Sequence, residues 1–467
     1  MPTPEKPVTG PERMQQIFGE DGLLSEHLEG YALREGQLEM AKAVDFAVSD
    51  GSVLVVEGPP GVGKSLAYLV PVMSSTQKGA DGGGRPRVVV ATANKALQDQ
   101  LTEKDLPFLK GMLSWPFTFR SVKGRDNYAC LKSVDEMKTA KARKGLSKKE
   151  RQEVRDITKW VGETTVGDKK ELAFVPMPDV WSKMSRGTDD CAGHKCALYT
   201  GCFVYKARRA GPEVLVTNYS LLLADVEVRS SSGSGVLPDY DLLICDEAHR
   251  LTEQARGAFG FEVTLRGSLA AVRPVDDGKG DESRERLHAG TRSLIDKLFG
   301  DLPKWNTAKH DDPRIRENPR TDMSRLSAHL TSCEEVLARR AGELDDPEKK
   351  ELMKKKAKRI ERLRERLEES LTARKGDRVY SLEDTGNGHV KIVAKLLDVA
   401  SLLAEKLWSY PKASILTSAT LAVGGGMGYV IDQLGLVRDG EDPYVSTIAS
   451  PFVHANQAVL YVPELPA

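Results

Sequence analysis

The chain of 467 residues is too long for a single ordinary core, and its length favours about three domains. Lysine and arginine together number 68, as do aspartate and glutamate, so the overall charge neither favours nor excludes an anionic partner. No apolar run approaches the roughly 20 residues that a membrane-spanning helix needs, and the N-terminus lacks the apolar segment of a signal peptide. We therefore expect a soluble cytoplasmic protein with no membrane partner.

The first part of the chain predicts alternating helices and strands. Residues 1–30 are expected to form a loose lead-in, and residues 37–48 place apolar side chains at helical spacing. Short β-rich runs follow, and several are apolar throughout, as in strands that a parallel sheet buries on both faces. Helical stretches lie between these runs, which predicts an α/β doubly wound fold. The predicted strands are residues 52–57, 87–92, 213–218, 241–246 and 413–418.

The segment SVLVVEGPPGVGKS, residues 52–65, fits the pattern G-x-x-x-x-G-K-[ST] between a predicted strand and a predicted helix. Glycines let backbone N–H groups curl around phosphates, and a helix that starts at the loop adds its positive end. Lys64 can reach the β- and γ-phosphates, and Ser65 can ligate Mg²⁺. A chance glycine-rich turn is the alternative, and the strand before the loop argues against it. The predicted nucleotide-binding residues of the loop are Gly58, Pro59, Pro60, Gly61, Val62, Gly63, Lys64 and Ser65.

Four cysteines lie in an insertion at about residues 125–210, which interrupts the α/β pattern. Sixty residues separate the first cysteine from the second, and gaps of four and five residues follow. The spacing lacks the paired CxxC units common in structural zinc sites, but by itself it leaves both zinc and an iron–sulfur cluster open. The four candidate ligands are Cys130, Cys191, Cys196 and Cys202.

The segment FVYKARRAG follows the last of these cysteines. It interleaves basic side chains with Phe203 and Tyr205, a combination that suits single-stranded DNA through backbone attraction and base stacking. The alternative is a packed helix with aromatic residues in the core and charges in solvent. The candidate DNA-binding residues here are Lys206, Arg208 and Arg209.

The segment DLLICDEAHR, residues 241–250, ends a buried strand in two acids and a histidine. A P-loop protein needs a carboxylate at the end of a second strand to hold Mg²⁺, and Asp246 is placed for that role. Glu247 could position and deprotonate the attacking water. A solvated turn is the alternative, and the phosphate loop earlier in the same chain argues against it.

A second insertion, about residues 255–400, is charge-rich and expected to be mostly helical. The segment KRIERLRERLEESL predicts an amphipathic helix, one arm of a hairpin, because its apolar residues recur at spacings of three and four. Residues 79–86 and 229–235 are rich in glycine and serine and are expected to be flexible connectors. The apolar stripe of the helix consists of Ile360, Leu363, Leu367 and Leu371.

Taken in order, GPPGVGKS, DEAH and LTSATL (416–421) resemble the motifs of superfamily 2 helicases. The cysteine spacing narrows the resemblance to iron–sulfur helicases of the XPD and DinG type. YALREGQLEM (31–40) is similar to the family's Q-like motif, and TANKALQDQL (92–101) to its motif Ia. SPF (450–452) is similar to the marker after motif III. The match is nearest to the bacterial DinG branch and spans nearly the whole chain.

This resemblance implies a RecA-like P-loop parallel sheet, the first motor domain of a helicase, interrupted by two insertions. One would bind an iron–sulfur cluster and the other would form an α-helical arch. The implied boundaries are 1–124, 211–254 and 401–467 for the RecA-like domain, 125–210 for the cluster insertion and 255–400 for the arch.

The resemblance also implies roles for single residues. Lys64 would bind the nucleotide phosphates, Ser65 and Asp246 would bind Mg²⁺, and Glu247 would be the catalytic base. Arg34 and Gln37 would face the adenine. The other implied roles are a [4Fe–4S] cluster on Cys130, Cys191, Cys196 and Cys202, coupling of hydrolysis to DNA by His249, Thr417 and Ser418, and DNA-backbone contacts by Thr92 and Lys95.

The implied function is ATP-dependent 5′→3′ translocation on single-stranded DNA and unwinding of forked or 5′-tailed duplexes. No motif resembling QxxGRxxR follows SPF, so we expect a second RecA-like domain in a longer chain or in a separate polypeptide. We expect these 467 residues alone to bind nucleotide but to hydrolyse ATP and unwind DNA poorly. Two alternatives remain open: a non-catalytic nucleotide- and DNA-binding module of a mobile-element or CRISPR-associated assembly, and a P-loop ATPase with a structural zinc site.

Overall fold

The computed structural model describes residues 10–75, 85–209, 211–274, 282–307, 313–315, 323–372, 374–386 and 389–452. The chain divides into two compact units, each assembled from separate segments. The first unit comprises Met1–Lys123, Ala210–Ala255 and Asp398–Ala467, and the second comprises Gly124–Arg209 and Arg256–Leu397.

A seven-stranded sheet forms the centre of the first unit, with strand order β10-β1-β9-β5-β2-β4-β3 and every neighbouring pair parallel. This confirms the α/β class and the five predicted strands. The two edge strands, β3 and β10, were not predicted because they are short and only partly buried, so they lack a continuous apolar run. The strands are β1 (Val53–Glu57), β2 (Val88–Thr92), β3 (Phe119–Ser121), β4 (Val214–Asn218), β5 (Leu242–Asp246), β9 (Ala413–Ser418) and β10 (Tyr444–Thr447).

The parallel register brings the carboxyl ends of the central strands to one edge of the sheet. Glu57 at the end of β1 lies beside Ser418 of β9, and Thr417 lies beside Asp246 of β5. Asp246 in turn lies beside Thr92 of β2. Ligands of open α/β sheets bind outside this edge, so the register alone brings the phosphate loop and the DEAH segment to the same place.

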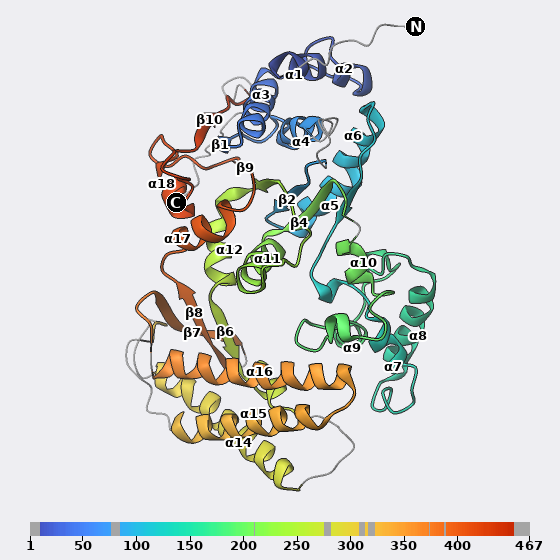
Figure 1. Ribbon diagram of the computed structural model, residues 1–467, viewed down its shortest axis with the longest axis vertical. Helices are drawn as coiled ribbons and strands as arrows, with labels where there is room; N and C mark the ends of the chain where they lie inside the picture. Colours follow the sequence, from blue (N-terminus) through green and yellow to red (C-terminus); the bar gives the residue numbers. More distant parts are fainter. Residues whose placement is uncertain are drawn as a thin grey trace, which may run out of the picture. The chain divides into compact units, whose positions relative to one another are not determined.

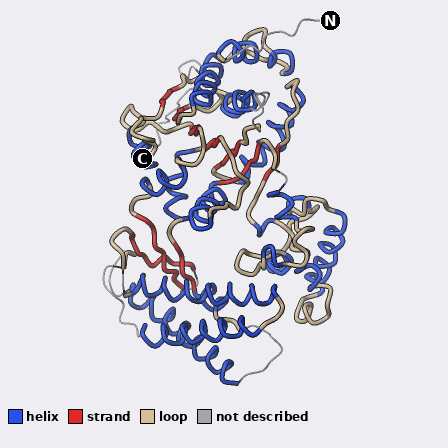
Figure 2. Tube along the Cα trace, viewed as in Figure 1, coloured by secondary structure: helices blue, strands red, loops and turns tan. Residues whose placement is uncertain are grey.

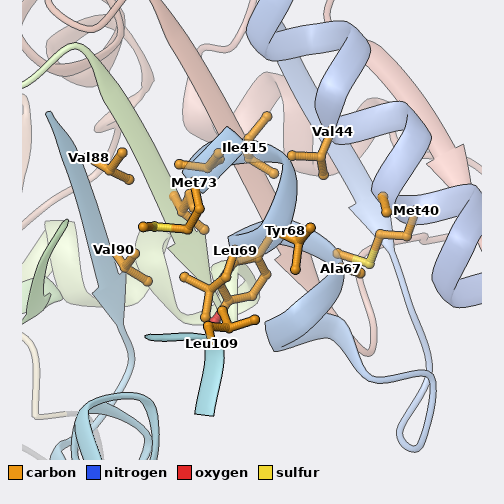
Figure 3. Packing of buried hydrophobic residues seen from close by; sticks show 14 of the residues in the cluster. Met40, Val44, Ala67, Tyr68, Leu69, Met73, Val88, Val90, Leu109 and Ile415 are labelled. Carbon is orange, nitrogen blue, oxygen red and sulfur yellow. The ribbon is translucent and has the colours of Figure 1, made fainter. Parts of the chain in front are cut away.

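Helices cover both faces of this sheet, and Figure 1 shows α3 and α4 on one side and α11 on the other. On the first side, Tyr68 and Met73 of α4 pack with strand residues such as Val90 in the main apolar cluster (Figure 3). The helices are α1 (Pro11–Phe18), α2 (Leu23–His27), α3 (Glu35–Asp50), α4 (Lys64–Ser75), α5 (Lys95–Gln100), α6 (Leu106–Met112), α11 (Tyr219–Ser232), α17 (Ala400–Leu403) and α18 (Gly428–Leu434), while α12 (Leu251–Ala258) crosses the boundary between the units.

The expectation of a loose lead-in over residues 1–30 was wrong from residue 11 onward. The helices α1 and α2 bury Met14, Phe18 and Leu24 in the main core. Their short apolar pattern was overlooked because glycines and charges surround it. Residues 1–9 lie outside the described residues.

The expectation of a flexible connector at 229–235 was also wrong in part, since α11 continues to Ser232 and ends at Gly233, whose φ is +73°. Arg229 holds this end of the helix in place. Its guanidinium donates to Asp225 at 3.2 Å and to Asp239 at 2.7 Å, and it lies 4.3 Å from the ring centroid of Tyr410. Of the other predicted connector, residues 79–84 lie outside the described residues.

Replacing Arg229 by alanine is expected to destabilise the first unit by about 3 kcal/mol, because it leaves the buried carboxylate of Asp225 without its cation. Chemical unfolding followed by circular dichroism measures the change. The matched control is Lys412→Ala, which breaks an exposed ion pair with Asp241 and should cost less than about 1 kcal/mol. Equal losses in the free energy of unfolding for the two variants would contradict a stabilising role of the Arg229 contacts with Asp225, Asp239 and Tyr410.

The second unit is mostly helical outside one small sheet (Figure 2). That sheet is antiparallel, in the order β6-β8-β7, with β6 (Phe261–Thr264), β7 (Arg378–Gly386) and β8 (His389–Leu396). The predicted amphipathic helix is confirmed as part of α16, and all four residues of its apolar stripe are buried. It forms the expected hairpin with α15. The helices are α7 (Leu131–Glu136), α8 (Lys148–Glu163), α9 (Pro178–Met184), α10 (Phe203–Arg209), α13 (Leu265–Ala271), α14 (Glu282–Thr307), α15 (Met323–Glu343) and α16 (Pro347–Leu371).

Within the second unit, α16 contacts the cysteine-bearing segment directly. Lys355 Nζ donates to the carbonyl oxygen of Cys191 at 2.8 Å, and Arg362 pairs with Asp189 at 2.8 Å. These contacts join the two insertions that the sequence predicts. In the described ranges of both units, no helix is both long enough and apolar enough to cross a bilayer.

Candidate functional site

The phosphate loop connects β1 to α4 and is shaped by two glycines in the left-handed region. Gly61 has φ +84° and Gly63 has φ +87°, backbone conformations that side chains other than glycine rarely adopt. A Cβ at Gly63 would also lie 2.2 Å from Nε2 of Gln37. Lys64 Nζ donates to the carbonyl oxygen of Gly58 at 3.0 Å, so the ammonium group already lies across the loop. The loop thus has the form of a phosphate cradle.

The start of α3 supplies two side chains to the same loop. Gln37 Nε2 donates to the carbonyl oxygen of Gly63 at 3.0 Å, and an Arg34 guanidinium nitrogen donates to that of Gly61 at 2.9 Å. Gln37 is buried and Arg34 is exposed. Both residues therefore contact the phosphate loop, while their contact with adenine stays a prediction.

Asp246 lies at the end of β5 with its carboxyl buried. The Tyr68 hydroxyl donates to its Oδ2 at 3.1 Å, and the Tyr219 hydroxyl donates to its backbone oxygen at 2.7 Å. Burial and the neighbouring Glu247 raise the pKa of Asp246 to about 6, while Tyr68 and the charge of Lys64 oppose the rise. Carboxylate and hydroxyl oxygens are ligands that Mg²⁺ prefers, so Asp246 and Ser65 suit the ion.

The raised pKa gives a pH-dependent prediction for Asp246→Asn in metal-free buffer. Between the ordinary pKa of 3.8 and the folded value of about 6, the folded protein retains a proton that the unfolded chain has lost. The carboxylate therefore destabilises the folded state increasingly as pH rises through this window, and fully above it. Thermal unfolding in EDTA should show the variant more stable than wild type above pH 6, by on the order of 1–3 kcal/mol, and equal near pH 4. A variant less stable at every pH would contradict this.

Glu247 is in the left-handed region, with φ +58°, although it is not a glycine. Such strain is found at functional sites where surrounding contacts hold it. Ser418 Oγ donates to Glu247 Oε2 at 3.1 Å, and His249 Nδ1 lies 2.6 Å from the same hydroxyl and 3.3 Å from Oε2. The structure thus brings together Glu247, His249 and Ser418 at the strand ends.

The other predicted coupling and DNA-contact residues of the first unit differ in exposure. Thr417 is buried, and its hydroxyl has no hydrogen-bond partner among the described residues. Thr92 is also buried, and its hydroxyl donates to the carbonyl oxygen of Asn94 at 2.9 Å. Lys95 is exposed at the start of α5. Direct contact of Thr92 and Lys95 with DNA stays a prediction.

The four candidate ligand cysteines, Cys130, Cys191, Cys196 and Cys202, are half-buried free thiols of the second unit. An Arg125 guanidinium nitrogen donates to Cys191 Sγ at 3.3 Å, and the Gly193 amide donates to the same sulfur at 3.4 Å. Burial raises the pKa of Cys202, and negative charge on Cys191 and Cys130 adds to the rise. Across the described ranges, however, no three His, Cys, Asp or Glu side chains are arranged to hold a metal ion. Four thiols are the donor type that an iron–sulfur cluster requires, so the residue types fit such a cluster although their arrangement here does not form its site.

The basic patch on α10 divides into outward and inward residues. Lys206 and Arg209 are exposed, and the Arg209 guanidinium lies 4.2 Å from the ring centroid of Tyr199. Arg208 is turned inward, where burial and the nearby Arg125 lower its pKa to about 10. Phe203 is buried. The exposed Lys206 and Arg209 suit the DNA-binding interpretation, whereas the buried Phe203 suits the packed-helix interpretation. DNA binding stays a prediction.

Three residues that lie at or contact the strand ends were not predicted from the sequence. Tyr68 and Tyr219 bind Asp246 through hydroxyl groups, and Glu57 accepts two backbone amides from the segment after β9. A tyrosine inside an otherwise apolar helix is a weak signal, because a buried hydroxyl usually has a partner. The signal for Glu57 is its position: it is a charged residue directly before the phosphate loop.

The chain was compared with protein-family models, curated proteins and solved structures. No family model matches. The chain is 29% identical to the ATP-dependent DNA helicase YoaA of Escherichia coli over 461 residues, which cover 96% of this chain and 69% of the relative. It is 29% identical to the ATP-dependent helicase DinG of Mycobacterium tuberculosis over 454 residues, which cover 93% of this chain and 66% of the relative.

A solved structure described as an XPD helicase aligns with a TM-score of 0.46 and 15% identity, covering 89% of this chain and 62% of that one. The chain thus spans about two thirds of the length of the two curated relatives. Because the sequence alignments cover nearly all of its residues, the resemblance stated above is confirmed: the chain is homologous over most of its length to the DinG and YoaA helicases.

Proposed function

We propose that the first unit is the first motor domain of an ATP-dependent DNA helicase of the DinG type. The observation that carries this proposal is the meeting of three motifs at one sheet edge. The parallel register places the end of β1, where the phosphate loop begins, beside the end of β9, and the end of β9 beside Asp246, while the hydroxyl of Ser418 in the third motif donates to Glu247. The relatives named above are ATP-dependent helicases, which supports the same activity here.

Hydrolysis would use the residues at the strand ends in distinct roles. Lys64 would exchange the carbonyl oxygen of Gly58 for the β- and γ-phosphates. Ser65 and Asp246 would hold Mg²⁺, which neutralises charge on the phosphates when it is bound. Glu247 would orient the attacking water and accept its proton, with its carboxylate fixed by Ser418. His249, which contacts the same hydroxyl, would link this carboxylate to DNA.

The finer parts of the proposal come from the resemblance. They are 5′→3′ translocation, single-stranded and 5′-tailed or forked DNA as substrates, and action in the cytoplasm. A second RecA-like domain, in the same polypeptide or another, would add cationic side chains to the phosphates, a contribution worth several powers of ten in related enzymes. The cluster and arch insertions would correspond to the two helical parts of the second unit.

A [4Fe–4S] cluster on Cys130, Cys191, Cys196 and Cys202 is the second part of the proposal. We expect anaerobically purified protein to contain about four iron and four sulfide per chain. Replacing Cys196 by serine should lower both sharply, whereas the same change at Cys333, a buried thiol of α15, should not. One zinc per chain without sulfide would favour the structural zinc site instead.

The activity is tested by the affinity for labelled single-stranded DNA and by ATP turnover with and without that DNA. We expect micromolar or tighter DNA binding and a stronger signal with single-stranded than with blunt duplex DNA. The chain alone should turn over ATP slowly, and turnover that DNA increases is expected once a second RecA-like domain is added. DNA and nucleotide binding without any turnover, even beside a second RecA-like domain, would favour the non-catalytic module. ATP turnover without any DNA binding would favour the alternative of a P-loop ATPase that does not act on DNA.

A further inference from the structure

Glu57 is the last residue of β1 and directly precedes the phosphate loop. Its Oε2 accepts the backbone N–H of Leu421 at 2.5 Å and that of Ala422 at 2.7 Å. These amides belong to the segment that leaves β9 after the third motif. One carboxylate oxygen therefore joins the root of the phosphate loop to a segment more than three hundred residues away in sequence.

The connection continues to the catalytic carboxylate. The Gly58 amide donates to the carbonyl oxygen of Ser418 at 2.9 Å. The side chain of Ser418 in turn donates to Glu247, as described above. Ser418 therefore contacts the phosphate loop through its backbone carbonyl oxygen and Glu247 through its hydroxyl group.

The chemistry of Glu57 suits a connecting role. Hydrogen bonds from amides to a carboxylate are roughly twice as strong as neutral ones. Among the residues that the structure describes, no lysine, arginine or histidine forms an ion pair with Glu57, and its carboxylate accepts the two amides instead. Beyond them, residues 423–426 form a tight turn with two glycines in the left-handed region, and Val423 is exposed. The carboxylate therefore anchors the start of an exposed loop.

We propose that Glu57 is a positioning residue that transmits the state of the phosphate loop to residues 421–422 and through Ser418 to Glu247, and so couples nucleotide binding to DNA binding. Phosphate binding would move Lys64 off the Gly58 carbonyl and change the loop at its root. Because Glu57 directly precedes the loop and its carboxylate accepts the amides of Leu421 and Ala422, the change would reach the segment after β9. This proposal rests on the function proposed above.

The test compares wild type with Glu57→Ala, Glu57→Gln and the control Glu39→Gln, an exposed glutamate on α3. For each, the affinity for single-stranded DNA is measured without nucleotide and with a saturating non-hydrolysable ATP analogue. The ratio of the two affinities is the coupling, which typically amounts to 5–150-fold in coupled systems. We expect Glu57→Ala to bring the ratio to one while the affinities for the analogue alone and for DNA alone change less than about threefold.

Glu57→Gln should restore part of the coupling, because its amide oxygen still accepts a hydrogen bond without the charge. Amide hydrogen exchange at Leu421 and Ala422 should accelerate in Glu57→Ala and less in Glu57→Gln, and stay as in wild type in Glu39→Gln. A wild-type ratio in Glu57→Ala, or a ratio of one in wild type itself, would overturn the inference. Failure of wild type to bind the analogue or DNA at all would instead overturn the proposed function.

Discussion

Replacing Lys64 by alanine is expected to weaken MgATP binding by about 100-fold or more. The ammonium group would make charge-assisted hydrogen bonds to two phosphates, each worth about 1.5–3 kcal/mol, and no other lysine belongs to the loop. Nζ donates to the carbonyl oxygen of Gly58 at 3.0 Å, so the ammonium group lies at the loop that would hold the phosphates. Isothermal titration calorimetry measures the loss.

The control for this variant is Lys412→Ala, which removes an exposed lysine elsewhere in the same unit. It should bind MgATP as wild type does. Equal heats of titration for Lys64→Ala and wild type would mean that the phosphates bind somewhere else, and the assignment of the loop would fail.

Replacing Glu247 by glutamine should lower ATP turnover by about 10²–10⁴-fold and leave nucleotide affinity almost unchanged. Glutamine keeps the shape and the hydrogen bond from Ser418 but cannot accept a proton from water. Turnover is measured with single-stranded DNA present and, if the chain alone is slow, with a second RecA-like domain added.

Glu253→Gln is the matched control for this effect, since Glu253 is an exposed glutamate of α12 a few residues away. It should turn over ATP at the wild-type rate. Turnover in Glu247→Gln that equals the control would show that another group accepts the proton, and the role of Glu247 would be wrong.

The sequence was sufficient for those parts of the fold that long apolar runs determine. Strands buried on both faces, such as β5, are apolar throughout, and a parallel sheet is the structure that buries them in this way. The edge strand β10 is mostly exposed, so its residues carry no such pattern. The helix α1 was not predicted for a related reason. It has only a few apolar residues, and these form no long pattern in the sequence but are buried by packing against the rest of the unit.

For the candidate site, the motifs predicted that the phosphate loop and Asp246 lie at the same edge of the sheet, because parallel strands place their carboxyl ends together. The hydroxyl of Tyr68 and the carboxylate of Glu57 were not predictable, since their partners lie far away in sequence. The cysteine pattern identified four donors but not their arrangement. The sequence also did not predict which side chains of the short helix α10 point inward, as the buried guanidinium of Arg208 shows.

The most direct measurement of the central claim is the affinity of the wild-type chain for ATP with Mg²⁺ and with EDTA. The claim is that the phosphate loop after β1 and Asp246 at the end of β5 share one nucleotide–metal site at the same edge of the sheet, with β9 between the two strands. It predicts that Mg²⁺ strengthens ATP binding at least about tenfold, equivalent to 1.4 kcal/mol, and that Asp246→Asn removes this gain but retains binding in EDTA. Equal affinities of wild type in Mg²⁺ and in EDTA would contradict it.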